Sequence, residues 1–332
     1  MMKIGVDAMG GDFAPKITVL GAMAAIKKFD DIEIVLYGKE EEIKKYLTDD
    51  TRITIKNCNE VISMGEKDPV KIVRSNLDYS LVEALKDGKD LKVDAVVSSG
   101  PTQAVVAISR LIVKPMKGMR RVALGPVIPS LDGKGKFLLD AGANVELNAE
   151  NIDQLAYFAT VVAENALGWK NPKVGLVNIG EEPGKGRQVD KEAYELLKAD
   201  KRINFFGNIE PKEMHFVDCD IFVTDGFSGN ILMKSMEGTA KMMSVMLKEE
   251  IKRNTRGKIG YLFMKKNLDK FKKRFDVTEV GGAMVCGVNI PIVKAHGNSD
   301  EYAFSNAIRL ARGMVKNDVI GKVKAGLGEL VE

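Results

Sequence analysis

A short glycine-bearing segment in the last third of the chain has the residue types of an anion-binding turn. Asp225-Gly-Phe-Ser-Gly-Asn230 follows a short apolar run and precedes a stretch with helical spacing. A helix N-terminus after a buried parallel strand presents unpaired N–H groups and a partial positive charge, which favour anions. Gly226 and Gly229 let a ligand approach the backbone, while Ser228 and Asn230 suit a helix cap or a substrate contact. A capped helix after a core strand explains the same spacing equally well.

Polar turns follow several other apolar runs, and their side chains are of kinds that bind ligands. The candidate substrate-binding residues in all these turns are Asp7, Gly10, Gly11, Ser99, Thr102, Asn144, Asp225, Gly226, Ser228, Gly229, His296 and Ser299. We expect the turns to converge, because the carboxyl ends of parallel strands meet at one end of a sheet. Turn capping is nevertheless the commoner role of a carboxylate such as Asp7, and a lone histidine is more often a turn residue than a catalyst.

Lys185 stands between two glycines in a polar loop. From there it could reach a phosphate or a carbonyl oxygen, although an ordinary solvated lysine fits the same pattern. The chain has no persuasive Ser-His-Asp or Cys-His order and no H-E-x-x-H motif, and no Ser or Thr follows Lys185 as a P-loop requires. The residues therefore favour binding an anion and stabilising an oxyanion over forming a covalent intermediate. We expect a small-molecule transferase or lyase with no cofactor and no metal site.

The elements that must position these side chains alternate between strands and helices, which predicts βαβ units and a mostly parallel sheet. Strands are expected at 3–8, 32–37, 53–56, 94–98, 137–140, 173–179, 221–223 and 291–295, and helices at 17–29, 40–47, 102–112, 148–166 and 300–316, with a further helix starting at 68. No repeats or long linkers interrupt this alternation, so one compact α/β unit over 1–332 is the simplest interpretation.

Composition bounds the class of protein. The 332 residues are 45% hydrophobic and 29% charged, as in globular proteins that bury a sizeable core. Cys58, Cys219 and Cys286 are widely spaced and odd in number, which argues for a reducing compartment without disulfides or a zinc site. No N-terminal apolar region and no membrane-spanning run is present, so we expect a cytoplasmic location.

One segment carries the basic character of the chain. The net charge is +4, but residues 248–274 hold eleven Lys and Arg against three acidic residues, so the remainder is acidic. The apolar and basic residues expected at the tip of a helical hairpin over 231–276 are Lys258, Ile259, Tyr261, Leu262, Phe263, Met264, Lys265 and Lys266. This composition is typical of an interfacial anchor on an anionic membrane. Nucleic acid is disfavoured because no base-stacking aromatics are interleaved, while a solvated hairpin with its tip in a dimer core remains open.

Several motifs together resemble a known family. They are Ile4-Gly-Val-Asp-Ala-Met-Gly-Gly-Asp12, Leu139-Asp-Ala-Gly-Ala-Asn144, Asn178-Ile-Gly-Glu-Glu182, Lys185-Gly186, Asp225-Gly-Phe-Ser-Gly-Asn230, Gly281-Gly-Ala283 and Lys294-Ala-His-Gly-Asn-Ser299. In this order they resemble the bacterial phosphate acyltransferases of phospholipid synthesis, the PlsX family, over essentially the whole chain. The chain departs from the family's usual pattern at Ser98-Ser-Gly-Pro-Thr-Gln-Ala104, at 74–80, at Arg121-Val-Ala123 and at Lys185-Gly-Arg187, where Lys-Gly-Asn is expected.

The resemblance implies transfer of a fatty acyl group from acyl carrier protein to orthophosphate. It also implies a three-layer αβα fold like the isocitrate and isopropylmalate dehydrogenases and the phosphotransacetylases, a homodimer, and peripheral attachment to the inner face of the membrane. On this interpretation Lys185 and Asn230 are the catalytic residues: Lys185 holds phosphate or polarises the thioester carbonyl, and Asn230 donates to the developing oxyanion. Two other hypotheses are a nicotinamide-dependent decarboxylating dehydrogenase of similar fold and a non-catalytic membrane-docking protein.

Overall fold

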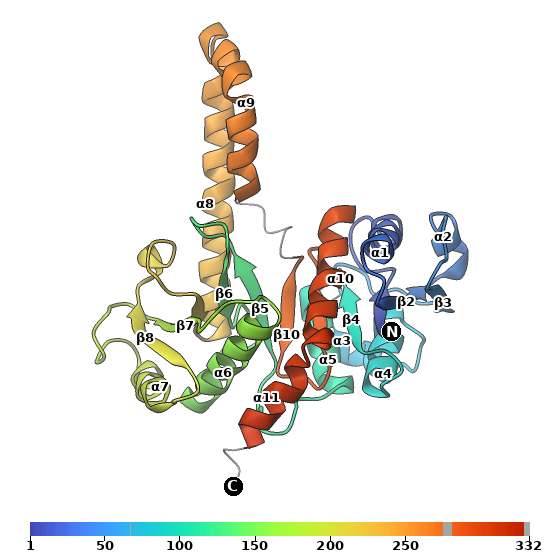
Figure 1. The fold of residues 1–332 in the computed structure, drawn as a ribbon, viewed down its shortest axis with the longest axis horizontal. Coiled ribbons are helices and arrows are strands. Elements are labelled where there is room, and N and C mark those ends of the chain that lie inside the picture. Colours follow the sequence, from blue (N-terminus) through green and yellow to red (C-terminus); the bar gives the residue numbers. More distant parts are fainter. Residues whose placement is uncertain (67, 275–280, 329–332) are drawn as a thin grey trace.

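The computed structural model describes residues 1–66, 68–274 and 281–328 (Figure 1). These residues form one eleven-stranded sheet in the order β3-β2-β1-β4-β11-β10-β5-β6-β9-β7-β8. The strands are β1 (Met2–Asp7), β2 (Ile32–Gly38), β3 (Ile53–Asn57), β4 (Ala95–Ser98), β5 (Ala123–Ile128), β6 (Lys136–Leu139), β7 (Lys173–Val177), β8 (Asn204–Ile209), β9 (Ile221–Val223), β10 (Ala283–Cys286) and β11 (Ile292–Lys294).

The direction of the strands reverses in the middle of the sheet. The strands β1, β2, β3, β4 and β11 are parallel to one another, and β6, β7, β8 and β9 form a second parallel group. Between them β10 is antiparallel to β11 and to β5, and β5 is antiparallel to β6. The two parallel groups therefore run in opposite directions, and their carboxyl ends lie at opposite ends of the sheet.

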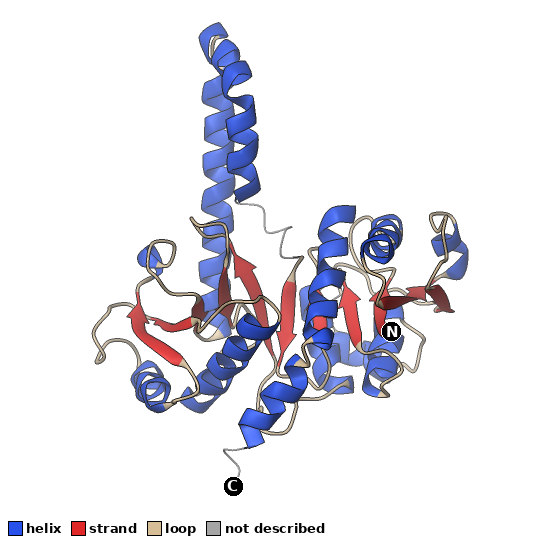
Figure 2. Cartoon of the chain, in the orientation of Figure 1, coloured by secondary structure: helices blue, strands red, loops and turns tan. Residues whose placement is uncertain are grey.

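Helices cover both faces of the sheet, which confirms the predicted layered α/β fold (Figure 2). Their bounds are α1 (Lys16–Lys28), α2 (Glu40–Lys44), α3 (Pro69–Arg74), α4 (Ser80–Lys89), α5 (Thr102–Ile112), α6 (Ala149–Asn165), α7 (Gln188–Ala199), α8 (Gly226–Lys252), α9 (Thr255–Arg274), α10 (Glu301–Lys316) and α11 (Val319–Gly328), with a short 3-10 turn at Pro211–Glu213. One hydrophobic core lies between one face of the sheet and the helices α1, α6, α7, α10 and α11. A second core lies between the other face and the helices α3, α4 and α5.

The alternation of side chains along the strands decides which core each residue enters. Phe137 and Leu139 of β6 belong to the first core, whereas Leu138 faces a third core that includes Phe222 of β9. The base of α8 packs on this third core through partly buried apolar residues such as Met233. Side chains in a strand point to opposite faces in turn, so each strand of the sheet supplies both layers.

The helices α8 and α9 pack against each other and project from the sheet as a hairpin (Figure 1). The 27 residues of α8 span about 40 Å, far more than the strands it crosses. The predicted apolar tip is wrong in detail: the turn contains Arg253 and Asn254, and Asn254 caps α9 by accepting the N–H of Gly257 at 2.8 Å. The apolar residues 259–264 instead lie within α9. Residues 275 and 276 of the expected hairpin lie outside the described residues.

Several elements were absent from the sequence prediction. These are β5, β8, β10, α4, α7 and α11. The run that becomes β10 contains two glycines at its start, Gly281 and Gly282, with φ of 95° and 143°, conformations that favour glycine. Glycines are depleted in strands, so this run carries no strand signal in the sequence, but pairing with β5 and β11 makes the residues after the glycines a strand.

Candidate active site

The reversal of the strands divides the candidate residues into two groups. The Asp7 cluster lies at the end of the sheet from which the hairpin projects and contains Asp7, Gly10, Gly11, Ser99, Thr102, His296 and Ser299. The Asn230 cluster lies at the opposite end and contains Asn144, Lys185, Asp225, Gly226, Ser228, Gly229 and Asn230. The expectation that all these turns converge therefore holds within each group but not between them, because β5 and β10 invert the direction of the second parallel group.

Asp7 holds the first group together. Its carboxylate accepts the hydroxyls of Ser80 and Ser98, each at 2.6 Å, and the backbone N–H of Met9 at 3.3 Å. Burial, which these donors only partly offset, raises the pKa of Asp7. A Cβ on Gly10 would lie 2.5 Å from Oδ2 of Asp7, so Gly10 allows two turns to pack closely. With Asp7 only 2% exposed, both residues have a structural explanation.

Three turns meet around Gly11. The N–H of Asp12 donates to the carbonyl of Gly297 at 2.8 Å, and a Cβ on Gly11 would lie 2.9 Å from Cβ of Ser99. Gly11 also has a φ of 109°, which favours glycine. Lys294, which belongs to a family motif but was not a candidate site residue, ends β11 beside these turns. Burial lowers its pKa, with Asp12 acting in the opposite direction.

The remaining residues of this group differ in accessibility. His296 is exposed, whereas Ser299 is buried and its N–H donates to the carbonyl of His296 at 3.1 Å.

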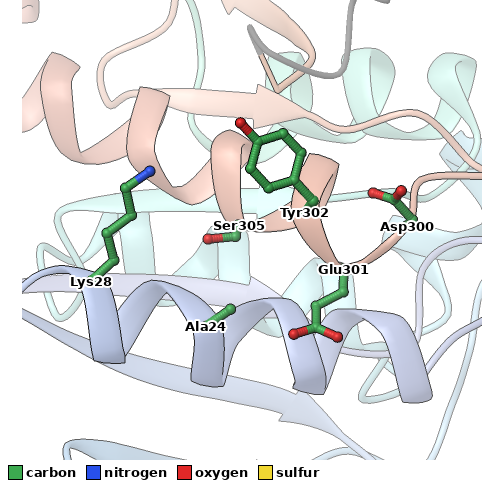
Figure 3. A pocket seen from close by; sticks show the side chains of 6 residues that line it. All are labelled: Ala24, Lys28, Asp300, Glu301, Tyr302 and Ser305. Carbon is green, nitrogen blue, oxygen red and sulfur yellow. The ribbon is translucent and has the colours of Figure 1, made fainter. Parts of the chain in front are cut away.

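Next to these residues, α1 and α10 border a pocket of about 370 Å³ (Figure 3). It is lined by Ala24, Lys28, Asp300, Glu301, Tyr302 and Ser305. None of the candidate residues lines it, so this pocket is separate from both clusters.

The second group is built on Asp140, a fully buried residue that follows β6. Its carboxylate accepts the N–H groups of Leu124, Gly142, Ala143 and Asn144 at distances from 2.8 to 3.1 Å. The side-chain amide of Asn144 donates to Asp140 and to the carbonyl of Val122, at 2.9 and 2.8 Å. The N–H groups of this turn and the Asn144 amide are thus committed to holding the turn.

The first turn of α8 packs directly on the Asp140 turn. A Cβ on Gly226 would lie 2.3 Å from the carbonyl oxygen of Asn144, and one on Gly229 only 1.9 Å from that of Asp140. The absence of a side chain at these two glycines therefore lets the backbone of α8 contact the backbone of the Asp140 turn. Asp225 is the cap of α8, accepting the N–H of Ser228 at 2.7 Å, so Ser228 and Asn230 lie inside the helix and do not cap it.

Three polar side chains of this cluster, those of Ser228, Asn230 and Lys185, remain available to a ligand among the described residues. Asn230 is half-buried against Gly142, whose Cβ, if present, would lie 3.3 Å from the Asn230 amide carbon. Its amide makes no hydrogen bond to another residue in the part of the chain that the structure describes. Lys185 has a half-exposed side chain, and its ammonium lies 4.0 Å from Glu182. An amide donor and a mobile cation are the groups that stabilise developing negative charge.

Arg187 joins the Lys185 loop to α8, a link that sequence reasoning missed. Its guanidinium lies 2.6 Å from Oδ2 of Asp225 and donates twice to Asp190, at 2.9 and 3.0 Å. In the sequence Arg187 stood out only as a departure from the expected asparagine. That departure is the only signal in the sequence, because its partner Asp225 lies 38 positions later.

The described residues offer few side chains that could act as a cysteine nucleophile or hold a metal ion. The three cysteines are buried, and burial raises the pKa of Cys58 and of Cys219 to about 12. No set of three or more His, Cys, Asp or Glu side chains is placed to hold a metal ion among the described residues. Within the same residues, no helix combines the length and apolar character needed to cross a bilayer.

Comparison with known proteins relates this chain to phosphate acyltransferases. The sequence profile of the family described as "Fatty acid synthesis protein" matches residues 2–322. The chain is 47% identical over 326 residues to a phosphate acyltransferase of Acholeplasma laidlawii, covering 98% of both chains. It is 44% identical over 324 residues to a phosphate acyltransferase of Bacillus cereus, again covering 98% of both.

Solved structures show the fold. A phosphotransacetylase from Streptococcus pyogenes matches with a TM-score of 0.63 at 19% identity, covering 95% of this chain and 94% of its own. A 4-hydroxythreonine-4-phosphate dehydrogenase from Klebsiella pneumoniae matches with a TM-score of 0.53 at 11% identity, covering 95% and 99%. These likenesses confirm the predicted relation to the phosphotransacetylase and dehydrogenase-like folds. The match of profile and sequence over nearly the whole length shows that the chain belongs to the fatty acid synthesis protein family, the PlsX family of phosphate acyltransferases.

Proposed function

We propose that this protein transfers a fatty acyl group from acyl carrier protein to orthophosphate, giving acyl phosphate and free carrier protein. Membership in a family of phosphate acyltransferases supports an acyl transfer in which phosphate takes part. The observation that carries the proposal is the Asn230 cluster: the uncommitted amide of Asn230 lies near the start of α8, and the half-exposed Lys185 lies two residues before Arg187, which pairs with Asp225 at the cap of α8. A helix N-terminus binds phosphate through its first N–H groups, and α8 begins with Gly226 and Phe227 ahead of its first intrahelical donor.

The chemistry that fits this arrangement is direct attack. An oxygen of orthophosphate forms a bond to the thioester carbonyl carbon, and the carbonyl oxygen becomes an oxyanion. Asn230 donates to that oxyanion, and Lys185 balances the charge of phosphate or of the oxyanion. When the carbonyl re-forms, the C–S bond breaks and the carrier protein leaves as its thiolate. No protein nucleophile is needed, which agrees with the buried, weakly acidic cysteines.

The test is thioester consumption from long-chain acyl carrier protein, with and without orthophosphate, while acyl phosphate is followed as the product. We expect loss of thioester only when phosphate is present, with one acyl phosphate formed for each thioester lost. No turnover by the folded protein would contradict the proposal. Reduction of a nicotinamide cofactor with a hydroxy acid would then favour the dehydrogenase hypothesis, and vesicle binding alone would favour the docking hypothesis.

The hairpin supports a second part of the proposal: a homodimer attached peripherally to the cytoplasmic face of the membrane. On α9, Leu262 is 71% and Phe263 84% exposed, beside exposed lysines at 258, 265 and 266. On α8, Met242, Met243 and Met246 are also exposed. Apolar side chains next to basic ones suit an anionic lipid surface, and the apolar length of α8 suits a second copy of the chain. Basic residues also suit acyl carrier protein, which is acidic as a class.

A further inference from the structure

We propose that Arg187 is a positioning residue that fixes Lys185 relative to Asn230 through its ion pair with Asp225. This inference rests on the proposed function, because it assigns Lys185 and Asn230 to one reaction site. Arg187 does not need to touch the substrate in order to act. It joins the two elements that carry the reacting groups, the loop after β7 and the first turn of α8.

Asp225 makes two contacts that together define this junction. One carboxylate oxygen accepts the N–H of Ser228 at 2.7 Å and so caps α8, while the other lies 2.6 Å from the guanidinium of Arg187. The Asp225 side chain is only 3% exposed, whereas Arg187 is 54% exposed. Removing a partner from a buried carboxylate leaves its charge uncompensated, so the pair is strongly coupled even though the arginine reaches solvent.

Asp190 holds Arg187 in the geometry that reaches Asp225. Its carboxylate accepts two hydrogen bonds from the guanidinium and one from the backbone N–H of Arg187, at distances from 2.8 to 3.0 Å. Asp190 lies in the first turn of α7, so the contact also fixes the end of the loop. Such bidentate contact restrains the planar guanidinium in a way that an ammonium cannot.

Two other side-chain hydrogen bonds that hold the loop after β7 come from residues at the ends of strands β7 and β8 and do not involve α8. The amide of Asn178 donates to the carbonyl of Lys185 at 3.2 Å, and that of Asn208 donates to the carbonyl of Glu182 at 2.8 Å. Glycines flank Lys185 on both sides, and Gly186 has a φ of 88°. Among the hydrogen bonds and ion pairs of residues 1–66, 68–274 and 281–328, the Arg187–Asp225 pair is therefore the one that links this loop to the helix bearing Asn230.

The experiment compares Arg187→Ala, Arg187→Lys and Asp225→Asn with the wild type in the acyl phosphate assay. Asparagine is also a good helix cap, so Asp225→Asn removes the charge pair but retains the cap. We expect Arg187→Ala to lower kcat by about 10- to 100-fold, because small misplacements of reacting groups carry costs of that order. We expect KM for acyl carrier protein to change little and Arg187→Lys to restore part of kcat, which loss of folding alone would not produce.

Arg312→Ala is the matched control. Arg312 forms a comparable bidentate pair with Asp31, at 2.5 and 2.6 Å, far from the Asn230 cluster. We expect this variant to lose stability but not kcat. The double variant Arg187→Ala/Asp225→Asn is expected to have the same kcat as Arg187→Ala, because both changes break one contact. An additive further loss, or a normal kcat in Arg187→Ala, would overturn the proposal.

Hydrogen exchange of the 181–187 amides provides a readout that does not depend on activity. We expect Arg187→Ala to increase exchange there while the amides of α10 stay as protected as in the wild type. Unchanged exchange would overturn the positioning role even if catalysis were lost. If the wild type showed no phosphate-dependent turnover but the exchange increased, the link would stand and the proposed function would fail.

Discussion

Replacing Gly229 by alanine should separate α8 from the Asp140 turn. The added Cβ would lie 1.9 Å from the carbonyl oxygen of Asp140, and that atom belongs to the backbone of a turn held by several hydrogen bonds. Carbon and oxygen atoms that are not bonded approach to about 3.3 Å, so the two backbones must move apart by roughly 1.4 Å. Asn230 is the next residue in α8 and moves with it.

The expected losses of stability and of reaction rate in Gly229→Ala follow from overpacking and from geometry. Forcing an extra carbon into a tight contact costs about 1–3 kcal/mol of the free energy of unfolding. A displacement near 1 Å of a group in the reaction site costs on the order of 100-fold in rate. We therefore expect Gly229→Ala to be folded but less stable by about 2 kcal/mol, with acyl phosphate formation reduced about 100-fold.

Gly238→Ala in the same helix is the control. Gly238 is exposed and nothing lies within 4 Å of its Cβ position, so alanine should stabilise α8 by about 0.5–1 kcal/mol through helix propensity. Urea unfolding gives the stabilities, and the thioester assay gives the rates. A Gly229→Ala variant as stable and as active as Gly238→Ala would refute the claim that contact between these backbones positions Asn230.

Three further predictions concern stability and the hairpin. Burial and the neighbouring Asp200 carboxylate raise the pKa of Asp153 to about 6, so its contribution to stability is present at low pH and is lost as pH rises through that value. Between about pH 4.5 and about pH 7.5, the free energy of unfolding measured with urea should therefore fall less in Asp153→Asn than in the wild type. Asp300 caps α10, so Asp300→Ala should lower the free energy of unfolding by about 1 kcal/mol, whereas Asp300→Asn should lower it by almost nothing. Equal losses of stability in the two variants would argue against the cap. Replacing Leu262 and Phe263 by serine should weaken flotation with phosphatidylglycerol-containing vesicles, whereas serine at Leu91, equally exposed but outside the hairpin, should not.

The alternation of strands and helices could be predicted because it depends on local periodicity. Helix 102–112 and strand 221–223 were predicted with the bounds that the structure has. The reversal of strand direction could not be predicted, because it depends on the antiparallel pairing of β5 with β10, two strands that lie far apart in the chain. That long-range pairing decides that Asp7 and Asn230 lie at opposite ends of the sheet.

Residue types identified the turns, but only packing distinguishes their roles. Asp7 and Asn144 look like ligand contacts in the sequence, yet the structure commits both to holding turns. Asn230 and Lys185 have similar sequence signals and remain available. Arg187 had no signal except its difference from the family pattern, because its partner is 38 residues away.

The most direct test of the account is the rate of acyl phosphate formation from acyl carrier protein by Asn230→Ala and Lys185→Ala. Both side chains lie at the surface of the cluster, so we expect both variants to unfold at the same urea concentration as the wild type. Loss of one oxyanion donor lowers kcat by about 100-fold or more, and we expect a loss of this order in each variant. Wild-type rates in both folded variants would contradict the claim that phosphate attacks the thioester at the N-terminus of α8.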